Sequence, residues 1–213
     1  MKIIIFGAAG EVGSRIVREA LFRNYEVTAI VRKPEQFSLL PDDAIPREGD
    51  VGNAQEVIKL IEGQDVIVSA IRPPSGQEEK LVPLTGSILN AAKHFDIRVL
   101  VVGGAASLKL PNQNDLTVLA APNFLPKEVI NIARACFAQH EICKTAINTN
   151  WTYLSPPAIL IPGIRTGSYR VGLEELVVDN DGISRISMED FAVALLDEIQ
   201  QPKHIKERFT VGY

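Results

Sequence analysis

The sequence contains only two cysteines and three histidines, and neither set has the spacing of a metal site. Cys136 and Cys143 are seven residues apart on one predicted helix. Their Cα atoms would therefore lie about 10 Å apart, which is too far for a disulfide bond. We expect neither a metal nor a disulfide, and a cytoplasmic location is the simplest interpretation.

Positive charge is also scarce, since 22 lysines and arginines face 26 acidic residues and the formal net charge is −4. This balance gives no basic field that would attract nucleic acid or an anionic membrane surface. No apolar run approaches the roughly 20 residues that a membrane-spanning helix needs. The first residues run directly into a predicted strand, so we expect no signal peptide. The expected partner is a small molecule, and both a monomer and a homodimer stay open.

What the sequence does contain is a regular alternation of short apolar runs and helical patterns. Continuous apolar strands separated by helices indicate a parallel sheet that is covered on both faces. The fold class is therefore α/β, a Rossmann-type doubly wound parallel sheet, in one domain over residues 1–213. The predicted strands are residues 2–7, 26–31, 44–51, 65–71, 97–104 and 151–156, and the predicted helices are residues 11–22, 53–63, 79–95 and 126–147.

The last third of the chain has a different pattern. Short strands are predicted at 167–172 and 175–186, around the turn "DNDG", and a final strand at 208–213. A helix is predicted over 187–199, with Ser187 as its N-cap. These pieces are too small for a separate domain, so we expect a small C-terminal cap at one end of the sheet.

A long segment, residues 104–125, separates the fifth predicted strand from the next helix. Loops of this length are often functional lids. This one follows a strand, so it lies at the carboxyl edge of the sheet, where ligands bind in Rossmann folds. Together with the loop at 72–79, it could cover a flat, apolar acceptor.

The opening stretch "GAAGEVG" places Gly7, Gly10 and Gly13 between the first strand and the first helix. In a dinucleotide-binding fold the first glycine allows a tight turn, the second lets the backbone approach a pyrophosphate, and the third allows close helix packing. Backbone N–H groups at the helix start then face the phosphates. The alternative is a glycine turn without a ligand, but the strand–loop–helix context favours dinucleotide binding. The loop residues expected at the cofactor are Gly7, Ala9, Gly10, Glu11 and Val12.

The end of the second strand indicates which dinucleotide is bound. NAD-preferring folds usually place an acidic residue there, whereas this chain has Arg32 and Lys33. A guanidinium pairs well with a 2′-phosphate, which favours NADP(H), with NAD(H) still possible. The alternative is two solvated charges on a loop, with Glu35 nearby. Asp50 and Val51, after the third strand, are expected near the adenine.

Several longer stretches carry a family resemblance. They are "GAAGEVG", "IVRKPE", "REGDV", "DVIVSAI", "RVLVVGGAASL", "WTYLSPPAILIPGIRTG" and "SRISMEDFAVALLDEI", which together span nearly the whole chain. By these stretches the sequence resembles an atypical short-chain dehydrogenase/reductase. Within that superfamily it is most similar to the NADH-flavin reductases, which are related to the biliverdin-IXβ/flavin reductases and to NmrA-like redox-sensor proteins.

The resemblance implies that segments after the fourth, fifth and sixth strands line the nicotinamide end of the cofactor. The implied residues are Ala70, Ile71 and Arg72 beside the ribose and diphosphate, Gly103 to Ser107 along the nicotinamide pocket, and Pro156 and Pro157 at the carboxamide.

The usual catalytic set of the superfamily is a serine, with a tyrosine and a lysine in the pattern Y-x-x-x-K. Here Ser107 falls near the serine position, but the helix carries His140 and Lys144, so the tyrosine is absent. The four-residue spacing places both side chains on one helix face, which Cys136 and Phe137 make mostly inward. An inward lysine could bind a ribose diol, and a histidine could donate a proton near neutral pH.

Each of these candidates also has a purely structural interpretation. His140 could be a satisfied core histidine, Lys144 could reach solvent, and Ser107 could be an ordinary loop hydroxyl. His94 and His204 are expected at the surface, and Trp151, which opens a strand, in the core.

The favoured function is an NADP(H)-dependent oxidoreductase that transfers a hydride to a conjugated acceptor such as a flavin or a quinone. The main alternative is a non-catalytic NADP(H)-binding redox sensor of the NmrA-like type. A third option, an enzyme similar to sugar-nucleotide epimerases, would need the Tyr–Lys acid/base pair and usually a longer substrate domain.

Overall fold

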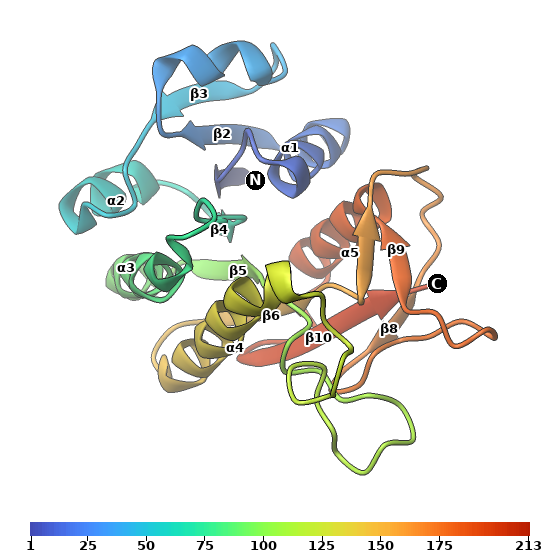
Figure 1. The fold of residues 1–213 in the computed structure, drawn as a ribbon. Coiled ribbons are helices and arrows are strands. Elements are labelled where there is room, and N and C mark those ends of the chain that lie inside the picture. Colours follow the sequence, from blue (N-terminus) through green and yellow to red (C-terminus); the bar gives the residue numbers. More distant parts are fainter.

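The computed structural model describes residues 1–213 as one sheet of eight strands with helices on both faces (Figure 1). The strand order is β3-β2-β1-β4-β5-β6-β10-β8, and all neighbours are parallel except β10 and β8. The sheet strands are β1 (Lys2–Phe6), β2 (Glu26–Val31), β3 (Ile45–Glu48), β4 (Val66–Ser69), β5 (Arg98–Val102), β6 (Trp151–Ser155), β8 (Arg170–Gly172) and β10 (Glu207–Gly212). The predicted Rossmann-type doubly wound sheet is confirmed.

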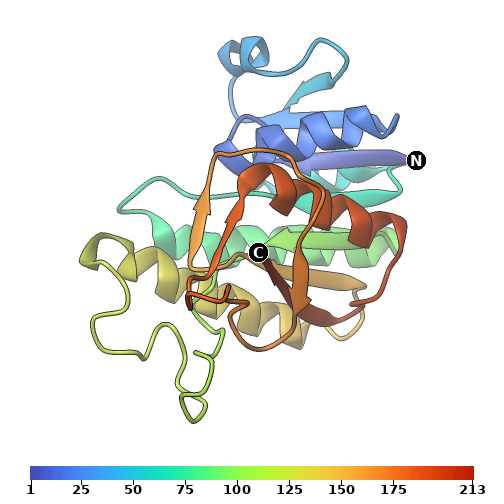
Figure 2. The same cartoon turned by 90° about the vertical axis from the view of Figure 1, so that its right-hand side faces the viewer.

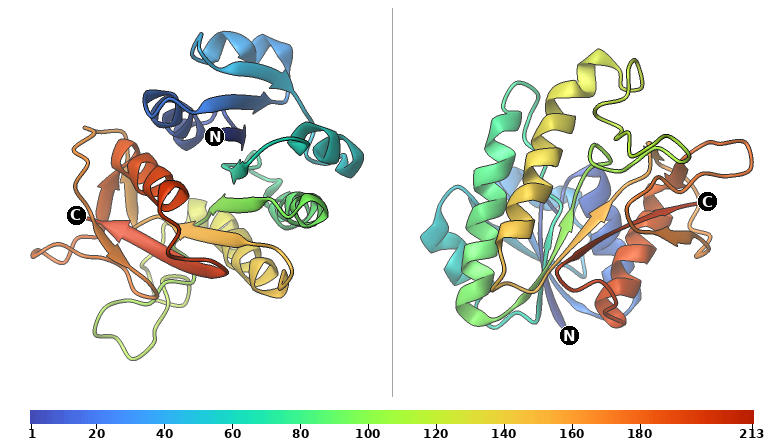
Figure 3. Two further views of the ribbon diagram at one scale, coloured as in Figure 1. Left: turned by 180° about the vertical axis from the view of Figure 1, so that it is seen from behind. Right: turned by 90° about the horizontal axis from the view of Figure 1, so that it is seen from below.

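Two helices cover one face of the sheet and three cover the other, as the view from below shows (Figure 3). One hydrophobic core of 23 buried residues joins the sheet to the first and last helices, and a second core of 18 joins it to the other three. The helices are α1 (Glu11–Phe22), α2 (Ala54–Ile61), α3 (Leu81–Phe95), α4 (Ile130–Thr145) and α5 (Met188–Gln200), with short 3-10 turns η1 (Pro34–Leu39), η2 (Glu78–Lys80) and η3 (Lys127–Val129).

Two helices begin with a side-chain cap, and the cap at Ser187 was predicted. The Asn53 side chain accepts a hydrogen bond from the Glu56 backbone N–H at 3.3 Å, at the start of α2. The Ser187 hydroxyl accepts one from the Asp190 N–H at 3.0 Å, at the start of α5. Both caps satisfy backbone donors that a helix leaves unpaired at its first turn.

The C-terminal cap differs in detail from the prediction. A second sheet pairs β7 (Ile159–Ile161) with β9 (Arg185–Ser187) in parallel, and β7 was not predicted. Of the short strands predicted around the turn "DNDG", the one after the turn is present as β9, and the one before the turn is wrong. Leu176 packs under the long loop instead, and Asp179 accepts hydrogen bonds from two N–H groups of the following turn. The third strand is also shorter than predicted and ends at Glu48.

The carboxyl ends of the parallel strands all lie on the side opposite the N-terminus (Figure 2). Strand order reverses between β1 and β4, so the switch point of the sheet is at these two strands. In open α/β sheets, ligands bind in the crevice at this point. The glycine loop leaves β1 at this edge.

The segment 104–125 forms a well-packed loop with a core of its own. Leu108, Leu110 and Val118 are buried together with Leu176. The loop reaches from the end of β5 toward the β10–β8 side of the sheet, away from the glycine loop (Figure 1). Through its position beside β10, the loop residue Ser107 meets Arg208 of that strand.

Candidate functional site: a dinucleotide crevice

The glycine loop is shaped by close backbone contacts. Gly7 has a φ of +80°, and a Cβ there would lie 2.4 Å from the Ala70 carbonyl oxygen at the end of β4. A Cβ on Gly13 would lie 2.1 Å from the Gly7 carbonyl oxygen. Gly10 differs, because an added Cβ would meet only that same oxygen, at 3.2 Å. The loop is therefore packed at its two ends and open at its middle, where a diphosphate would lie.

Unpaired backbone donors line this opening. Gly10 is the N-cap of α1 and has no side chain, and the Ser14 N–H donates to its carbonyl at 2.8 Å. That bond begins the helix, so the N–H groups of Glu11, Val12 and Gly13 have no acceptor within it. Free N–H groups and the helix dipole both favour a negatively charged group here. A phosphate fits the donor set.

Arg32 and Lys33 lie at the end of β2. β2 and β4 lie on opposite sides of β1, from which the glycine loop leads into α1. Both side chains are exposed, neither forms an ion pair within the chain, and together with Gln36 they line an open hollow. Glu35 does not neutralise either of them. The two cations are thus available to an anion.

Asp50 and Val51 follow β3 in a tight turn. The Asp50 carboxylate accepts the Gly52 N–H at 2.8 Å, and Val51 is buried in the second core. Contact of either residue with an adenine stays a prediction.

The residues expected at the nicotinamide end lie on the ends of three neighbouring strands. Ala70 and Ile71 are half-buried after β4, and Arg72 is exposed. Gly103 continues the ladder from β5, donating its N–H to the Leu154 carbonyl at 2.9 Å, and half-buried Pro156 follows β6. The structure brings these segments to one edge, as the resemblance implies.

Ser107 and His140 are brought together at the same edge. His140 is only 6% exposed, and its Nδ1 lies 3.4 Å from the Ser107 hydroxyl. Arg208 of β10 donates from Nη1 to the same hydroxyl at 2.6 Å. Burial, together with the nearby charges of Arg208 and Lys144, lowers the pKa of His140 to about 4. His140 is therefore neutral at pH 7, and Ser107 can direct its proton toward Nδ1.

Lys144 does not share this environment. Its side chain is 50% exposed and pairs with Glu141 at 2.6 Å, so the predicted inward position of Lys144 is wrong. The neighbouring Cys143 is fully buried, but the long lysine side chain reaches solvent. A role of Lys144 at the cofactor ribose stays a proposal.

The sequence interpretation missed three polar residues of this region. Arg208 pairs with Glu174, and the Tyr153 hydroxyl accepts the Gly104 N–H at 3.1 Å while lying 2.9 Å from the Cys136 carbonyl. Tyr153 is fully buried, and burial raises its pKa well above the ordinary value. For Tyr153 and Arg208 the available signal was a hydroxyl-bearing or charged side chain among apolar residues of a strand, whereas Glu174 lies outside the strands and gave no such signal.

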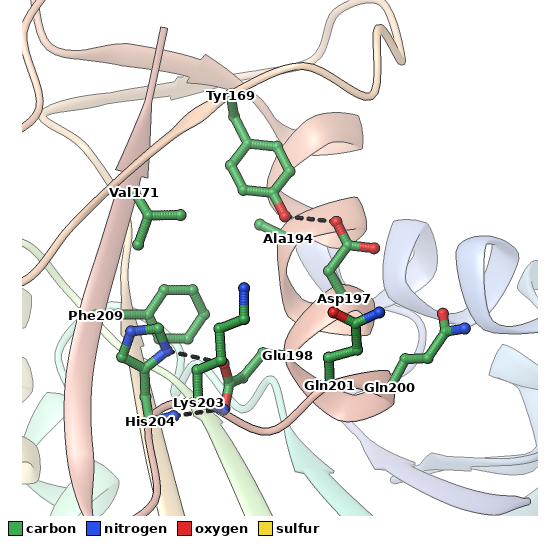
Figure 4. Close-up of a pocket in the computed structure, with 10 residues that line it drawn as sticks. All are labelled: Tyr169, Val171, Ala194, Asp197, Glu198, Gln200, Gln201, Lys203, His204 and Phe209. Atoms are coloured by element: carbon green, nitrogen blue, oxygen red, sulfur yellow. Dashed lines mark hydrogen bonds and ion pairs between the residues drawn. The ribbon is translucent and has the colours of Figure 1, made fainter.

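A second hollow of about 340 Å³ lies between α5 and the β8–β10 pair, remote from the glycine loop (Figure 4). Its acidic side chains are paired within the chain, whereas Lys203 forms no ion pair. The Tyr169 hydroxyl donates to Asp197 at 2.5 Å, and His204 Nδ1 lies 2.8 Å from the Glu198 carboxylate. His204 also stacks on Phe209, with ring centroids 4.5 Å apart. The prediction that His204 is a surface residue is therefore wrong.

The remaining minor predictions hold. His94 is exposed near the end of α3, and Trp151 is 4% exposed in the core. Cys136 and Cys143 are both unpaired. No helix is long and apolar enough to cross a bilayer.

Known proteins resemble this chain over its full length. Residues 7–199 match the family described as NAD(P)H-binding. The YwnB protein of Bacillus subtilis is 39% identical over 215 residues, covering 99% of this chain and 98% of that protein. The solved structure of a candidate epimerase from Bacteroides thetaiotaomicron is 35% identical, with a TM-score of 0.91, covering 100% of this chain and 96% of that one. A candidate NADH-flavin reductase from Streptococcus pneumoniae is 30% identical, with a TM-score of 0.82 and coverage of 100% and 99%.

Proposed function

Since this chain belongs to the family of NAD(P)H-binding oxidoreductase-like proteins, we propose that it is an NADP(H)-dependent reductase acting on a conjugated acceptor, such as a flavin or a quinone. The observation that carries the NADP(H) preference is the pair of unpaired cations, Arg32 and Lys33, beside a glycine loop that is open at Gly10. The similar Streptococcus pneumoniae protein, described as a candidate NADH-flavin reductase, supports the choice of acceptor.

Each segment around the crevice is expected to hold a different part of the cofactor. The N–H groups at the start of α1 would hold the diphosphate, and Arg32 and Lys33 the 2′-phosphate. When bound, NADPH supplies a hydride from its nicotinamide. The segments after β4, β5 and β6, including Gly103 and Pro156, would orient that ring and exclude water from it. Their main task is proximity, since donor and acceptor must approach to about 3–3.5 Å.

The absence of the superfamily tyrosine supports a conjugated acceptor. A carbonyl that becomes an alkoxide needs a positioned acid, whereas a flavin or quinone spreads the incoming charge and can take its proton from water. His140 stands in the tyrosine position, but its lowered pKa leaves it a poor acid at pH 7. Tyr153 lies beside His140, but it is buried and its hydroxyl is hydrogen-bonded to the backbone. An epimerase mechanism, which needs a Tyr–Lys pair, has less support from these side chains.

The cofactor preference gives the first prediction. NADPH is expected to bind about tenfold or more tightly than NADH, because charge-assisted hydrogen bonds to a phosphate contribute about 1.5–3 kcal/mol. Arg32→Asp should erase or reverse this preference, as measured by the two dissociation constants. Arg18→Asp makes the same charge change at an exposed position of α1 and serves as the control. Equal constants for the two cofactors in the unmodified protein would contradict the proposal.

The role of His140 gives the second prediction. His140→Ala should lower turnover with NADPH and a soluble flavin by less than about tenfold, well under the 10²–10⁴ that a general acid contributes. Lys144→Ala, on the same helix, should act mainly by weakening NADPH binding. Steady-state kinetics separate the two effects, with circular dichroism to confirm that both variants fold. A thousandfold loss of turnover in His140→Ala at unchanged NADPH affinity would identify His140 as the acid.

The same assay separates the enzyme from the redox sensor. A sensor would bind NADPH but oxidise it no faster than a blank without protein, whatever flavin or quinone is offered.

We place the protein in the cytoplasm, a proposal supported by its two unpaired cysteines.

A further inference from the structure

Arg208 is a buried cation with no place in the function proposed so far. Its side chain is 3% exposed, and it lies on β10 facing the long loop. One terminal nitrogen donates to Ser107, the other pairs with the carboxylate of Glu174, and Nε has no partner. A buried guanidinium without an anion is strongly unfavourable. Arg208 therefore needs a negative group beside it at all times.

The anion that it has is only loosely held by the fold. The Glu174 side chain is 58% exposed, on the segment between β8 and β9. Its carboxylate can turn into water at little cost, because a hydrated carboxylate is stable by itself. Another anion that entered from solvent could then take its position without leaving Arg208 unpaired.

Further unpaired donors lie on the same face of the sheet. The hydroxyls of Ser155 and Thr210 are buried and have no hydrogen-bond partner. Thr210 is two residues from Arg208 on β10, and the register places Ser155 opposite Thr210. Side chains two residues apart share a face of a strand, so these hydroxyls point to the side on which Arg208 lies. Nε and the two hydroxyls are donors without acceptors, which is the complement of an oxyanion.

The position of this cluster connects it to the acceptor. Ser107, which Arg208 contacts, follows β5 in the segment proposed to line the nicotinamide pocket, and it also contacts His140. A group that binds Arg208 would thus belong to a molecule that lies against this pocket. Among conjugated acceptors, flavin nucleotides carry an anionic phosphate at the end of a flexible chain.

Building on the proposed function, we propose that Arg208 and Ser107 bind the phosphate of a phosphorylated flavin acceptor, and that Glu174 occupies this position in its absence. Glu174 then acts as an internal competitor that keeps the buried guanidinium paired between catalytic cycles. A guanidinium matches a phosphate well because its planar fork can donate two parallel hydrogen bonds.

The test compares FMN with riboflavin, which share the ring system and differ in the phosphate. Dissociation constants are measured by quenching of flavin fluorescence at saturating NADP⁺, without turnover. We expect FMN to bind about tenfold or more tightly than riboflavin. Glu174→Gln should increase that preference severalfold, because the competing carboxylate is lost. Its amide oxygen can still accept a hydrogen bond from Arg208, and the melting temperature reports how much stability the lost charge costs. Glu175→Gln removes the same charge one residue along and should change nothing.

Arg208→Lys keeps the buried charge but loses the fork, so it should fold and lower the FMN preference severalfold. Equal binding of FMN and riboflavin by the unmodified protein would overturn this inference and leave flavin reduction standing. Binding of neither flavin would overturn the proposed acceptor and this inference together. An unchanged FMN preference in Arg208→Lys, or equal effects of Glu174→Gln and Glu175→Gln, would also overturn the inference.

Discussion

Valine in place of Gly10 is expected to abolish dinucleotide binding while the protein still folds. Gly10 has a φ of −75°, which any residue can adopt, and an added Cβ meets only one atom, at 3.2 Å. The branched side chain would instead fill the opening above the loop, where the diphosphate must approach the backbone. The affinity for NADPH should fall at least about a hundredfold. Titration calorimetry measures the loss, and the melting temperature reports the fold.

Gly13→Ala is the matched control from the same loop. Its Cβ would lie 2.1 Å from a backbone carbonyl oxygen, which cannot move aside as a side chain can. This smaller substitution should therefore destabilise the protein more than Gly10→Val does. If Gly10→Val bound NADPH normally, the loop would be only a turn between strand and helix.

A second large effect is expected at Asp190, in the first turn of α5. Its buried carboxylate accepts the N–H groups of Thr166 and Gly167, each at 2.8 Å, and the hydroxyls of Thr166 and Tyr213, at 2.6 and 2.7 Å. These bonds fasten the segment between β7 and β8 to α5. Asp190→Ala should lower the free energy of unfolding by about 3 kcal/mol, since hydrogen bonds to a charged group contribute about 1.5–3 kcal/mol each and are not additive.

Urea unfolding measures this loss, with Asp43→Ala as a control at an exposed carboxylate in a surface turn. Burial alone would raise the pKa of Asp190, but the hydrogen bonds from Thr166, Gly167 and Tyr213 lower it below the usual range. The carboxylate therefore stabilises the folded state above about pH 4, its unfolded pKa, and the contribution is lost as the pH falls further. Asp190→Ala should lack that part of the acid sensitivity. A loss no larger than that of Asp43→Ala would rule out this role.

The sheet could be predicted because its strands are buried on both faces. Runs such as Ile3 to Phe6 and Val66 to Val68 are continuous and apolar, and such runs in alternation with helices are typical of a covered parallel sheet. The glycine loop could be predicted from the spacing of its glycines, because close backbone contacts at Gly7 and Gly13 leave no room for a Cβ. Both features depend on residues that are near each other in the sequence.

The rest of the candidate site depends on contacts between distant residues. The spacing of His140 and Lys144 places them near one helix face, but it does not show whether a long lysine side chain turns inward or reaches solvent. His140 is buried, whereas Lys144 is half exposed and pairs with Glu141, although Cys143 beside it is buried. Arg208 meets Ser107 across 101 residues, and only the order of the strands brings them together. The strand β7 was missed because it has only three residues and lies between prolines, at positions 157 and 162.

The long loop after β5 has a consequence for how the crevice can open. The Lys109 N–H donates to the Glu174 carbonyl at 2.8 Å, and the Leu176 N–H donates back to Lys109 at 3.0 Å. The loop and the segment 174–176 also share one small hydrophobic cluster. They therefore form a single cooperative unit, whose local unfolding breaks all of these bonds together rather than one at a time. While this unit stays folded, the backbone of Glu174 remains beside Arg208, so only the Glu174 side chain has to turn for another anion to enter. Lifting of the loop would uncover Arg208 and open the crevice to solvent in one event.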